Sequence, residues 1–212
     1  MLELSLLQKI IISIIPVLFA ITVHEVAHGW VADKLGDPTA RMLGRLTLNP
    51  IKHIDPIGTI LVPGVLLLLG GFIFGWAKPV PITWQNLKHP RRDVALVSIA
   101  GPMANLIMAI FWAIMFKVAL TLNPQPINLP FALLTMSQIG VIINVILMVL
   151  NLIPIPPLDG SRVVASFLPR KMQYQYDRIE PYGFFVLLIL LATGLLTAIM
   201  GPFVDFFVAL LL

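Results

Sequence analysis

The chain has 212 residues, of which 58% are hydrophobic and 11% are charged, and its formal net charge is +4. Because soluble domains carry about a quarter charged residues, this composition excludes an ordinary soluble protein and predicts an integral membrane protein. The sequence has no cysteine, which excludes disulfides and thiolate chemistry, and no basic stripe stands apart from the apolar segments, which argues against binding of nucleic acid.

The first apolar segment predicts a helix from about Leu6 to about Lys34, which is long enough to cross a bilayer. Ser5 is a suitable N-cap for this helix, and Pro16 within it predicts a kink.

This helix carries His24, Glu25 and His28 in the pattern H-E-x-x-H. Two histidines four residues apart project from one face of a helix, so both imidazoles can bind the same metal ion. Glu25 lies beside them, where it could accept a proton from a metal-bound water. An ionisable cluster within an apolar helix is energetically costly and indicates a functional site.

The rest of the chain alternates between polar and apolar stretches. Residues 33–55 are polar and rich in turn-forming residues. Residues 56–74 are apolar but contain prolines and glycines, and alternating prolines in residues 75–83 are typical of an extended edge strand or loop. Three later apolar segments are predicted to span the membrane as helices: about 94–120, 131–152 and 181–200. Residues 161–180 are amphipathic and charged, and the apolar residues 203–212 are too short to span a bilayer alone.

The Lys and Arg residues distinguish two topologies. If residues 56–74 dip into the membrane and return, twelve loop charges lie on one face and only Lys9 and Lys117 lie on the other, whereas a full crossing divides the charges nine to five. The first arrangement satisfies the positive-inside rule better, and it places the C-terminal end of the first helix and Asp159 on the cytoplasmic side. We therefore predict that residues 56–83 form a re-entrant element beside the metal site, because irregular backbone at membrane depth must be buried in protein or line a wet cavity.

Two histidines leave a catalytic zinc site one ligand short, because such sites use three protein ligands and keep a position open for water. Asp159 is the best candidate for the third ligand. It follows a proline-rich helix end and precedes Gly160, so the backbone can turn the carboxylate inward. Other carboxylates are less favourably placed, among them Asp33, Asp55, Asp93 and Asp205.

Three motifs together resemble the site-2 protease family of intramembrane zinc metalloproteases. They are H-E-x-x-H in an apolar helix, G-P-x-x-N at residues 101–105, and N-x-x-P-x-P-P-L-D-G at residues 151–160. The similarity covers roughly residues 10–162, and residues 75–82 also resemble a segment of the minimal, PDZ-less members.

The resemblance implies one zinc ion per chain, held by His24, His28 and Asp159, with Glu25 as the general base. It also implies that Asn151 helps to stabilise the tetrahedral intermediate. Asn105 matches a family position that serves helix packing near the site.

The sequence thus predicts an all-α polytopic membrane protein, a transmembrane helix bundle of about four to six membrane segments with a re-entrant or extended segment near the metal site. The chain, residues 1–212, is expected to form one membrane-embedded metalloprotease domain, with a catalytic core of about 6–165 and C-terminal helices in 181–212. The sequence carries no signal for the oligomeric state.

The expected activity is hydrolysis of peptide bonds in or near transmembrane segments of membrane proteins, within the cell membrane and with the zinc site toward the cytoplasm. Carbonyl groups of a substrate helix are shielded by their own hydrogen bonds, so the substrate must first unwind locally. An extended edge near Lys78–Thr83 could pair with the unwound segment by β-augmentation.

Other functions make different demands on the sequence. A proteolytically inactive scaffold for transmembrane helices predicts a broken motif, whereas every expected residue is present. A metal transporter needs ionisable residues at mid-membrane in several helices, and the later spans hold almost none. Proteases that remove C-terminal tripeptides also use H-E-x-x-H but take a glutamate as third ligand, and Glu180 lacks such a context.

Some polar residues are expected to lie outside the site. His53 and His89 lie among polar loop residues and are expected to be solvated. Asn144 lies seven residues before Asn151 on the same helix face, but it is not expected to take part in the site.

Overall fold

The computed structural model describes residues 6–62, 64–65, 78–125 and 128–212, and these residues form helices and loops without a β-strand. Helices long and apolar enough to cross a membrane are α1 (Leu6–Leu35), α4 (Pro90–Thr121) and α5 (Leu129–Leu152). The prediction of an all-α membrane protein is confirmed. Pro16 lies inside the continuous α1, and the predicted N-cap Ser5 lies outside the described residues.

Shorter elements connect the long helices. They are α2 (Thr39–Met42), η1 (Pro50–His53), η2 (Pro56–Leu61), η3 (Trp84–Asn86), α6 (Asp159–Phe167) and α7 (Arg170–Asp177). The chain ends with α8 (Glu180–Ala192) and α9 (Leu195–Leu211).

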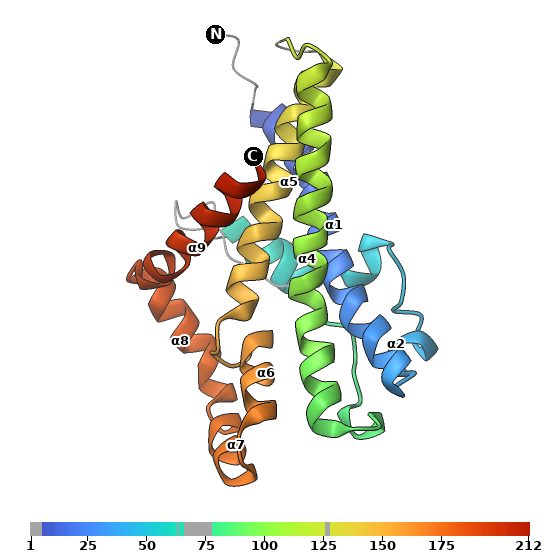
Figure 1. The fold of residues 1–212 in the computed structure, drawn as a ribbon, viewed down its shortest axis with the longest axis vertical. Helices are drawn as coiled ribbons and strands as arrows, with labels where there is room; N and C mark the ends of the chain where they lie inside the picture. Colours follow the sequence, from blue (N-terminus) through green and yellow to red (C-terminus); the bar gives the residue numbers. More distant parts are fainter. Residues whose placement is uncertain (1–5, 63, 66–77, 126–127) are drawn as a thin grey trace.

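The long helices pack around one apolar core. α4 and α5 run side by side, and α1 packs against both (Figure 1). Trp112 of α4 lies against Gly140 of α5, where a Cβ atom would come within 2.3 Å of the indole ring. The absence of a side chain at Gly140 therefore lets the two helices approach closely. Other buried core residues include Ala109, Ala113, Val141, Val145, Met148 and Val149.

The ends of α5 follow from its sequence. At its start, Asn128 Oδ1 accepts a hydrogen bond from the Phe131 N–H group at 2.9 Å, as an N-cap residue does. At its end, Ile153 has an extended conformation because it precedes Pro154, and a residue before proline is restricted to extended backbone. The helix therefore stops just before the segment that leads to Asp159.

The prediction of one continuous helix over 181–200 is wrong. Helices α8 and α9 are separated at Gly194 and bend by 79° (Figure 1). Gly194 has φ +75°, a left-handed conformation that glycine adopts at little cost and that commonly ends helices. The apolar residues 203–212 are not a separate element, because most of them continue α9, which packs against α5.

Within the predicted re-entrant element, residues 56–83, positions 63 and 66–77 lie outside the described residues, and the two flanks of the element make defined contacts. The Lys78 N–H group donates to the carbonyl oxygen of His53 at 3.0 Å, and the Lys88 N–H group donates to the Leu35 carbonyl at 3.3 Å. His53 and Lys78 therefore lie together on the face where α1 ends. The re-entrant topology itself stays a prediction.

Single cysteines can test this topology cleanly because the chain has none of its own. We expect Lys52→Cys and Lys88→Cys to react with a membrane-impermeant maleimide from the same side of the membrane. Lys117→Cys, near the other end of α4, is the control and should react from the opposite side. All three positions are exposed, and labelling of positions 52 and 88 from opposite sides would contradict the arrangement.

Candidate metal centre

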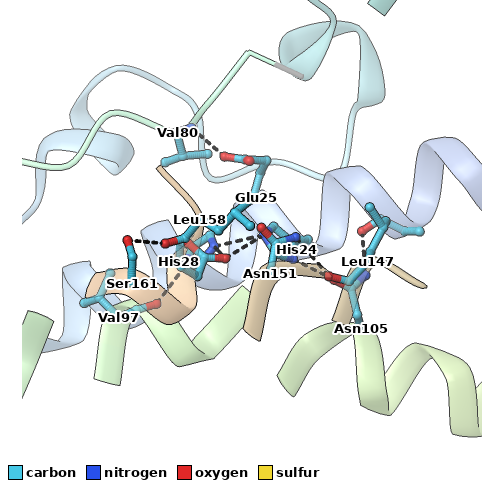
Figure 2. Close-up of polar contacts among 12 residues, drawn as sticks. His24, Glu25, His28, Val80, Val97, Asn105, Leu147, Asn151, Leu158 and Ser161 are labelled. Carbon is cyan, nitrogen blue, oxygen red and sulfur yellow. Dashed lines mark hydrogen bonds and ion pairs between the residues drawn. The ribbon is translucent and has the colours of Figure 1, made fainter. Parts of the chain in front are cut away.

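Two histidines of α1 lie together in the site (Figure 2), and Asp159, the first residue of α6, converges on the same point. His24 Nε2 lies 3.1 Å from His28 Nε2, and each of these atoms lies 3.2 Å from Asp159 Oδ2. The imidazoles are buried and Asp159 is partly buried. Within the described part of the chain, this is the one group of three His, Asp or Glu side chains whose ligand atoms could hold a metal ion.

Hydrogen bonds of the Nδ1 atoms determine which ring nitrogens are protonated. His24 Nδ1 lies 2.6 Å from Asn105 Oδ1, and His28 Nδ1 lies 2.7 Å from the carbonyl oxygen of Val97. The Asn105 amide is oriented by its Nδ2 atom, which donates to the Ala20 carbonyl at 3.2 Å. Because both oxygens can only accept, each Nδ1 carries the hydrogen. In the neutral imidazoles each Nε2 atom therefore carries an unprotonated lone pair, and both lone pairs face the point shared with Asp159 Oδ2.

A divalent cation fits this arrangement. Three electron-pair donors 3.1–3.2 Å apart repel one another unless a cation lies between them. The spacing matches the edge of a zinc tetrahedron, which is about 3.3 Å for metal–ligand bonds of about 2.0 Å. Asp159 Oδ2 is buried and receives no hydrogen bond from any described residue. Two imidazoles and one carboxylate are a donor set that catalytic zinc ions use.

Gly101 of α4 makes room for the two imidazoles. A Cβ atom at this position would lie 2.3 Å from His28 Nε2 and 2.7 Å from His24 Nε2. Both distances are far below van der Waals contact, so a side chain at position 101 would displace the nitrogens that face the metal position. The G-P-x-x-N motif contains Gly101, but this role depends on a contact between helices that the spacing of the motif does not reveal.

The turn between α5 and α6 brings Asp159 to the histidines. Gly160 lies against the end of α5, where a Cβ atom would come within 2.3 Å of the Leu152 carbonyl oxygen. The Tyr176 hydroxyl donates to the Pro154 carbonyl at 2.6 Å and ties α7 to the turn. The Asp-Gly pair thus begins a helix packed tightly against the preceding one.

Glu25 contacts the segment of residues 78–83, which directly precedes η3. Its Oε2 atom accepts a hydrogen bond from the Val80 N–H group at 2.7 Å (Figure 2). The Val80 side chain is buried, and a Cβ atom at Gly29 would lie 2.7 Å from Val80 Cγ1. The segment is therefore seated directly on α1, one residue beyond His28.

Asp37, in the loop after α1, fixes the C-terminal end of this segment. Its fully buried carboxylate accepts hydrogen bonds from the Thr83 N–H group at 2.7 Å and from Asn86 Nδ2 at 2.9 Å. It also accepts from the Thr39 N–H group at 3.2 Å and from the Thr39 hydroxyl. One carboxylate therefore joins the loop after α1 to the residues on both sides of Trp84.

Arg45 and His53 fix the N-terminal end. Arg45 Nη2 donates to the carbonyl oxygens of Lys78 and Pro79 at 3.0 and 3.3 Å. The His53 carbonyl accepts from the Lys78 N–H group at 3.0 Å. The expectation that His53 is solvated is wrong: its side chain is 2% exposed, and its Nε2 atom contacts the Thr47 carbonyl at 2.9 Å. A loop histidine can be buried when it supports a neighbouring segment, and local polarity does not show this.

These contacts bear on the expected pairing with substrate. Residues 78–83 form a loop, one of the two forms that the sequence predicts, and their N–H groups at Lys78, Val80 and Thr83 already donate to the protein itself. Prolines at 79 and 81 have no N–H group. Among the described contacts, the N–H group of Ile82 is the one donor of this segment that stays available for an incoming strand.

Asn151 lies in the last turn of α5, and its Nδ2 atom donates to the Leu147 carbonyl at 3.0 Å. The side chain is partly buried. This bond uses one of the two amide hydrogens, and no described residue accepts the other.

Comparison with known proteins identifies the family. YwhC of Bacillus subtilis, which is named as a zinc metalloprotease, is 40% identical over 206 residues, covering 95% of the chain and 88% of YwhC. The chain belongs to peptidase family M50. The sequence model of this family, described as Peptidase family M50, matches residues 129–194.

Two further relatives agree with the M50 assignment. Rip2 of Mycolicibacterium smegmatis, also named as a zinc metalloprotease, is 30% identical over 187 residues, which cover 83% of the chain and 64% of Rip2. The regulator of sigma E protease of Haemophilus influenzae is 32% identical over 119 residues, which cover 52% of the chain and 27% of that protein. No solved structure matches the chain.

Family membership confirms the resemblance found in the motifs. The M50 protein is an intramembrane zinc metalloprotease of the site-2 protease family, with zinc as its cofactor. Its apolar helices make it a multi-pass membrane protein. The family assignment favours the protease over the scaffold and the transporter.

Replacing Asp37 by asparagine should destabilise the M50 protein by about 1–3 kcal/mol, because an amide nitrogen would face buried donors. Burial alone raises the pKa of Asp37, but hydrogen bonds from Thr39, Asn86 and Thr83 outweigh it and hold this pKa below its usual 3.8. A lowered folded pKa stabilises the fold above the unfolded pKa, and the contribution is lost as the pH falls. The difference in thermal unfolding between wild type and variant should be constant from about pH 7 to about pH 5 and shrink below about pH 4.

The matched control is Asp177→Asn, which changes an exposed carboxylate at the end of α7. This variant should unfold at the wild-type temperature throughout the pH range. A deficit of Asp37→Asn that persists unchanged to about pH 3 would show that the Asp37 charge does not carry the stabilisation.

Proposed function

We propose that His24, His28 and Asp159 hold the catalytic zinc ion of this M50 protein, one ion per chain. The observation that carries the proposal is the convergence of three bare acceptor atoms 3.1–3.2 Å apart, with both histidine Nδ1 hydrogens already donated elsewhere. Zinc bound there would lower the pKa of a water molecule toward neutrality and polarise a substrate carbonyl.

Glu25 is the general base in this proposal. It accepts a proton from the water that attacks the peptide carbonyl and returns the proton to the leaving nitrogen. The Val80 N–H group holds Oε2 at 2.7 Å, which leaves Oε1 as the oxygen that transfers the proton. The segment that carries Val80 therefore orients the base, and it is anchored at both ends by buried charged side chains, Arg45 and Asp37.

Asn151 is proposed to donate a hydrogen bond to the developing oxyanion. Its free amide hydrogen supports this role, and donors prearranged around an oxyanion commonly lower the barrier by several kcal/mol. In this proposal Glu25 protonates the leaving nitrogen, and Asn151 donates a hydrogen bond to the oxyanion.

The substrates are proposed to be transmembrane segments of other proteins, cleaved in the cell membrane after local unwinding. The site is proposed to face the cytoplasm. Support comes from the loops, since Lys88 lies at the end of α1 and Lys78 lies against His53. The re-entrant topology expected from the sequence would put twelve basic residues on that face, as the positive-inside rule favours for the cytoplasm.

Glu25→Gln tests the assigned chemistry because it keeps the shape of the side chain and removes the base. We expect cleavage of a reconstituted single-pass model peptide with a glycine-proline pair in its membrane segment to fall by roughly 10²–10⁴-fold. Zinc content should stay at the wild-type level, because Glu25 is not a proposed ligand. Products are followed by mass spectrometry.

Glu180→Gln is the matched control, because Glu180 is exposed and its ion pair with Arg162 lies at the surface. This variant should cleave the peptide at close to the wild-type rate. Wild-type cleavage by Glu25→Gln would refute the role of the base, and loss of zinc from that variant would refute the ligand assignment.

A further inference from the structure

Two buried asparagines lie behind the metal centre and connect three helices. Asn105 of α4 accepts from His24 Nδ1 of α1 at 2.6 Å, and its own Nδ2 atom donates to Asn144 Oδ1 of α5 at 2.9 Å. Asn144 Nδ2 in turn donates to the Gly140 carbonyl at 2.8 Å. Both asparagines are fully buried, with 0% of their surface exposed.

This chain of hydrogen bonds has only one possible direction. Its far end is the carbonyl oxygen of Gly140, which can only accept, so Asn144 must present its NH₂ group there and its oxygen to Asn105. Asn105 must then present its NH₂ group to Asn144 and its oxygen to His24. The hydrogen of His24 is thereby held on Nδ1, and the Nε2 lone pair is held toward the metal position.

We propose that Asn144 is a positioning residue of the zinc site: through Asn105 it fixes the tautomer and orientation of His24 and so raises the affinity for zinc. The inference rests on the proposed role of His24 as a zinc ligand. It assigns a function to a residue that sequence analysis had placed outside the site.

Helix packing alone does not account for Asn144. A buried amide in an apolar helix is costly unless it is hydrogen-bonded, and Asn144 is bonded at both its oxygen and its nitrogen. Ser137 lies on the same helix and is equally buried, yet its hydroxyl has no hydrogen-bond partner among the described residues. Ser137 is thus a buried polar residue of α5 that has no hydrogen-bond connection to the site among the described residues, in contrast to Asn144.

The test measures zinc affinity by competition with a fluorescent chelator, using the purified full chain in detergent. Asn105→Ala should raise the zinc Kd by about 10–100-fold, as loss of the hydrogen-bond partner of a metal-bound histidine does. Asn144→Ala should raise it by about five- to tenfold, because it removes one of the two acceptors that orient the Asn105 amide, the other being the Ala20 carbonyl. Ser137→Ala, the matched control, should leave the Kd within about twofold of wild type.

A double variant separates positioning from general destabilisation. If Asn144 acts through Asn105, Asn105→Ala with Asn144→Ala should bind zinc no more weakly than Asn105→Ala alone. Asn144→Ser should recover part of the affinity, because a serine hydroxyl can accept from Asn105 and donate to the carbonyl four residues earlier. The visible spectrum of the cobalt-substituted protein should change in Asn144→Ala and stay unchanged in Ser137→Ala.

The outcomes are distinguishable. Wild-type zinc affinity and an unchanged cobalt spectrum in Asn144→Ala would overturn the positioning role while leaving the zinc site intact. Additive losses in the double variant would overturn the path through Asn105. If Asn144→Ala does not fold, Asn144→Leu, which has a similar volume and no hydrogen-bonding group, replaces it in these comparisons, and wild-type Kd values and spectra there would overturn the proposal. Failure of the wild type itself to bind zinc would contradict the ligand assignment instead.

Discussion

In the neutral imidazoles, the lone pairs of His24 Nε2 and His28 Nε2 point at the same place as Asp159 Oδ2, because both Nδ1 atoms hold the ring hydrogens. Their mutual repulsion in a buried site is relieved by a cation. The rest of the structure is arranged to hold these three atoms. α1 carries both imidazoles, and α4 packs closely against them because Gly101 has no side chain. The turn after α5 places the carboxylate of Asp159 beside them.

Both proposed histidine ligands and the proposed base are oriented by hydrogen bonds to residues elsewhere in the chain. The carbonyl of Val97 and the amide of Asn105 hold the two histidines, and the Val80 N–H group holds Glu25. Because Val80 belongs to a segment anchored by loop residues outside the membrane helices, these loops orient the proposed base. The proposed catalytic groups within the membrane thus depend on supporting residues in the loops.

Several features of the fold and of the candidate metal site were predictable from local sequence. The spacing of His24 and His28 places them on one helix face, and the Asp-Gly pair after the proline-rich helix end indicated Asp159. Apolar length predicted the long helices. Other features depend on contacts between distant residues: the burial of His53, the bond between Glu25 and Val80, and the asparagine pair at 105 and 144. The break at Gly194 was missed because glycine is common within membrane helices, and only its positive φ marks a helix end.

The most direct test of this account is the zinc content of the purified protein, measured by mass spectrometry for wild type, Asp159→Ala and Asp205→Ala. Asp205 is an exposed carboxylate on α9 and serves as the control. The account predicts about one zinc per chain in wild type and in Asp205→Ala, and less than about a tenth of that in Asp159→Ala. Full zinc content in Asp159→Ala would contradict the claim that α1 and α6 form a single metal site.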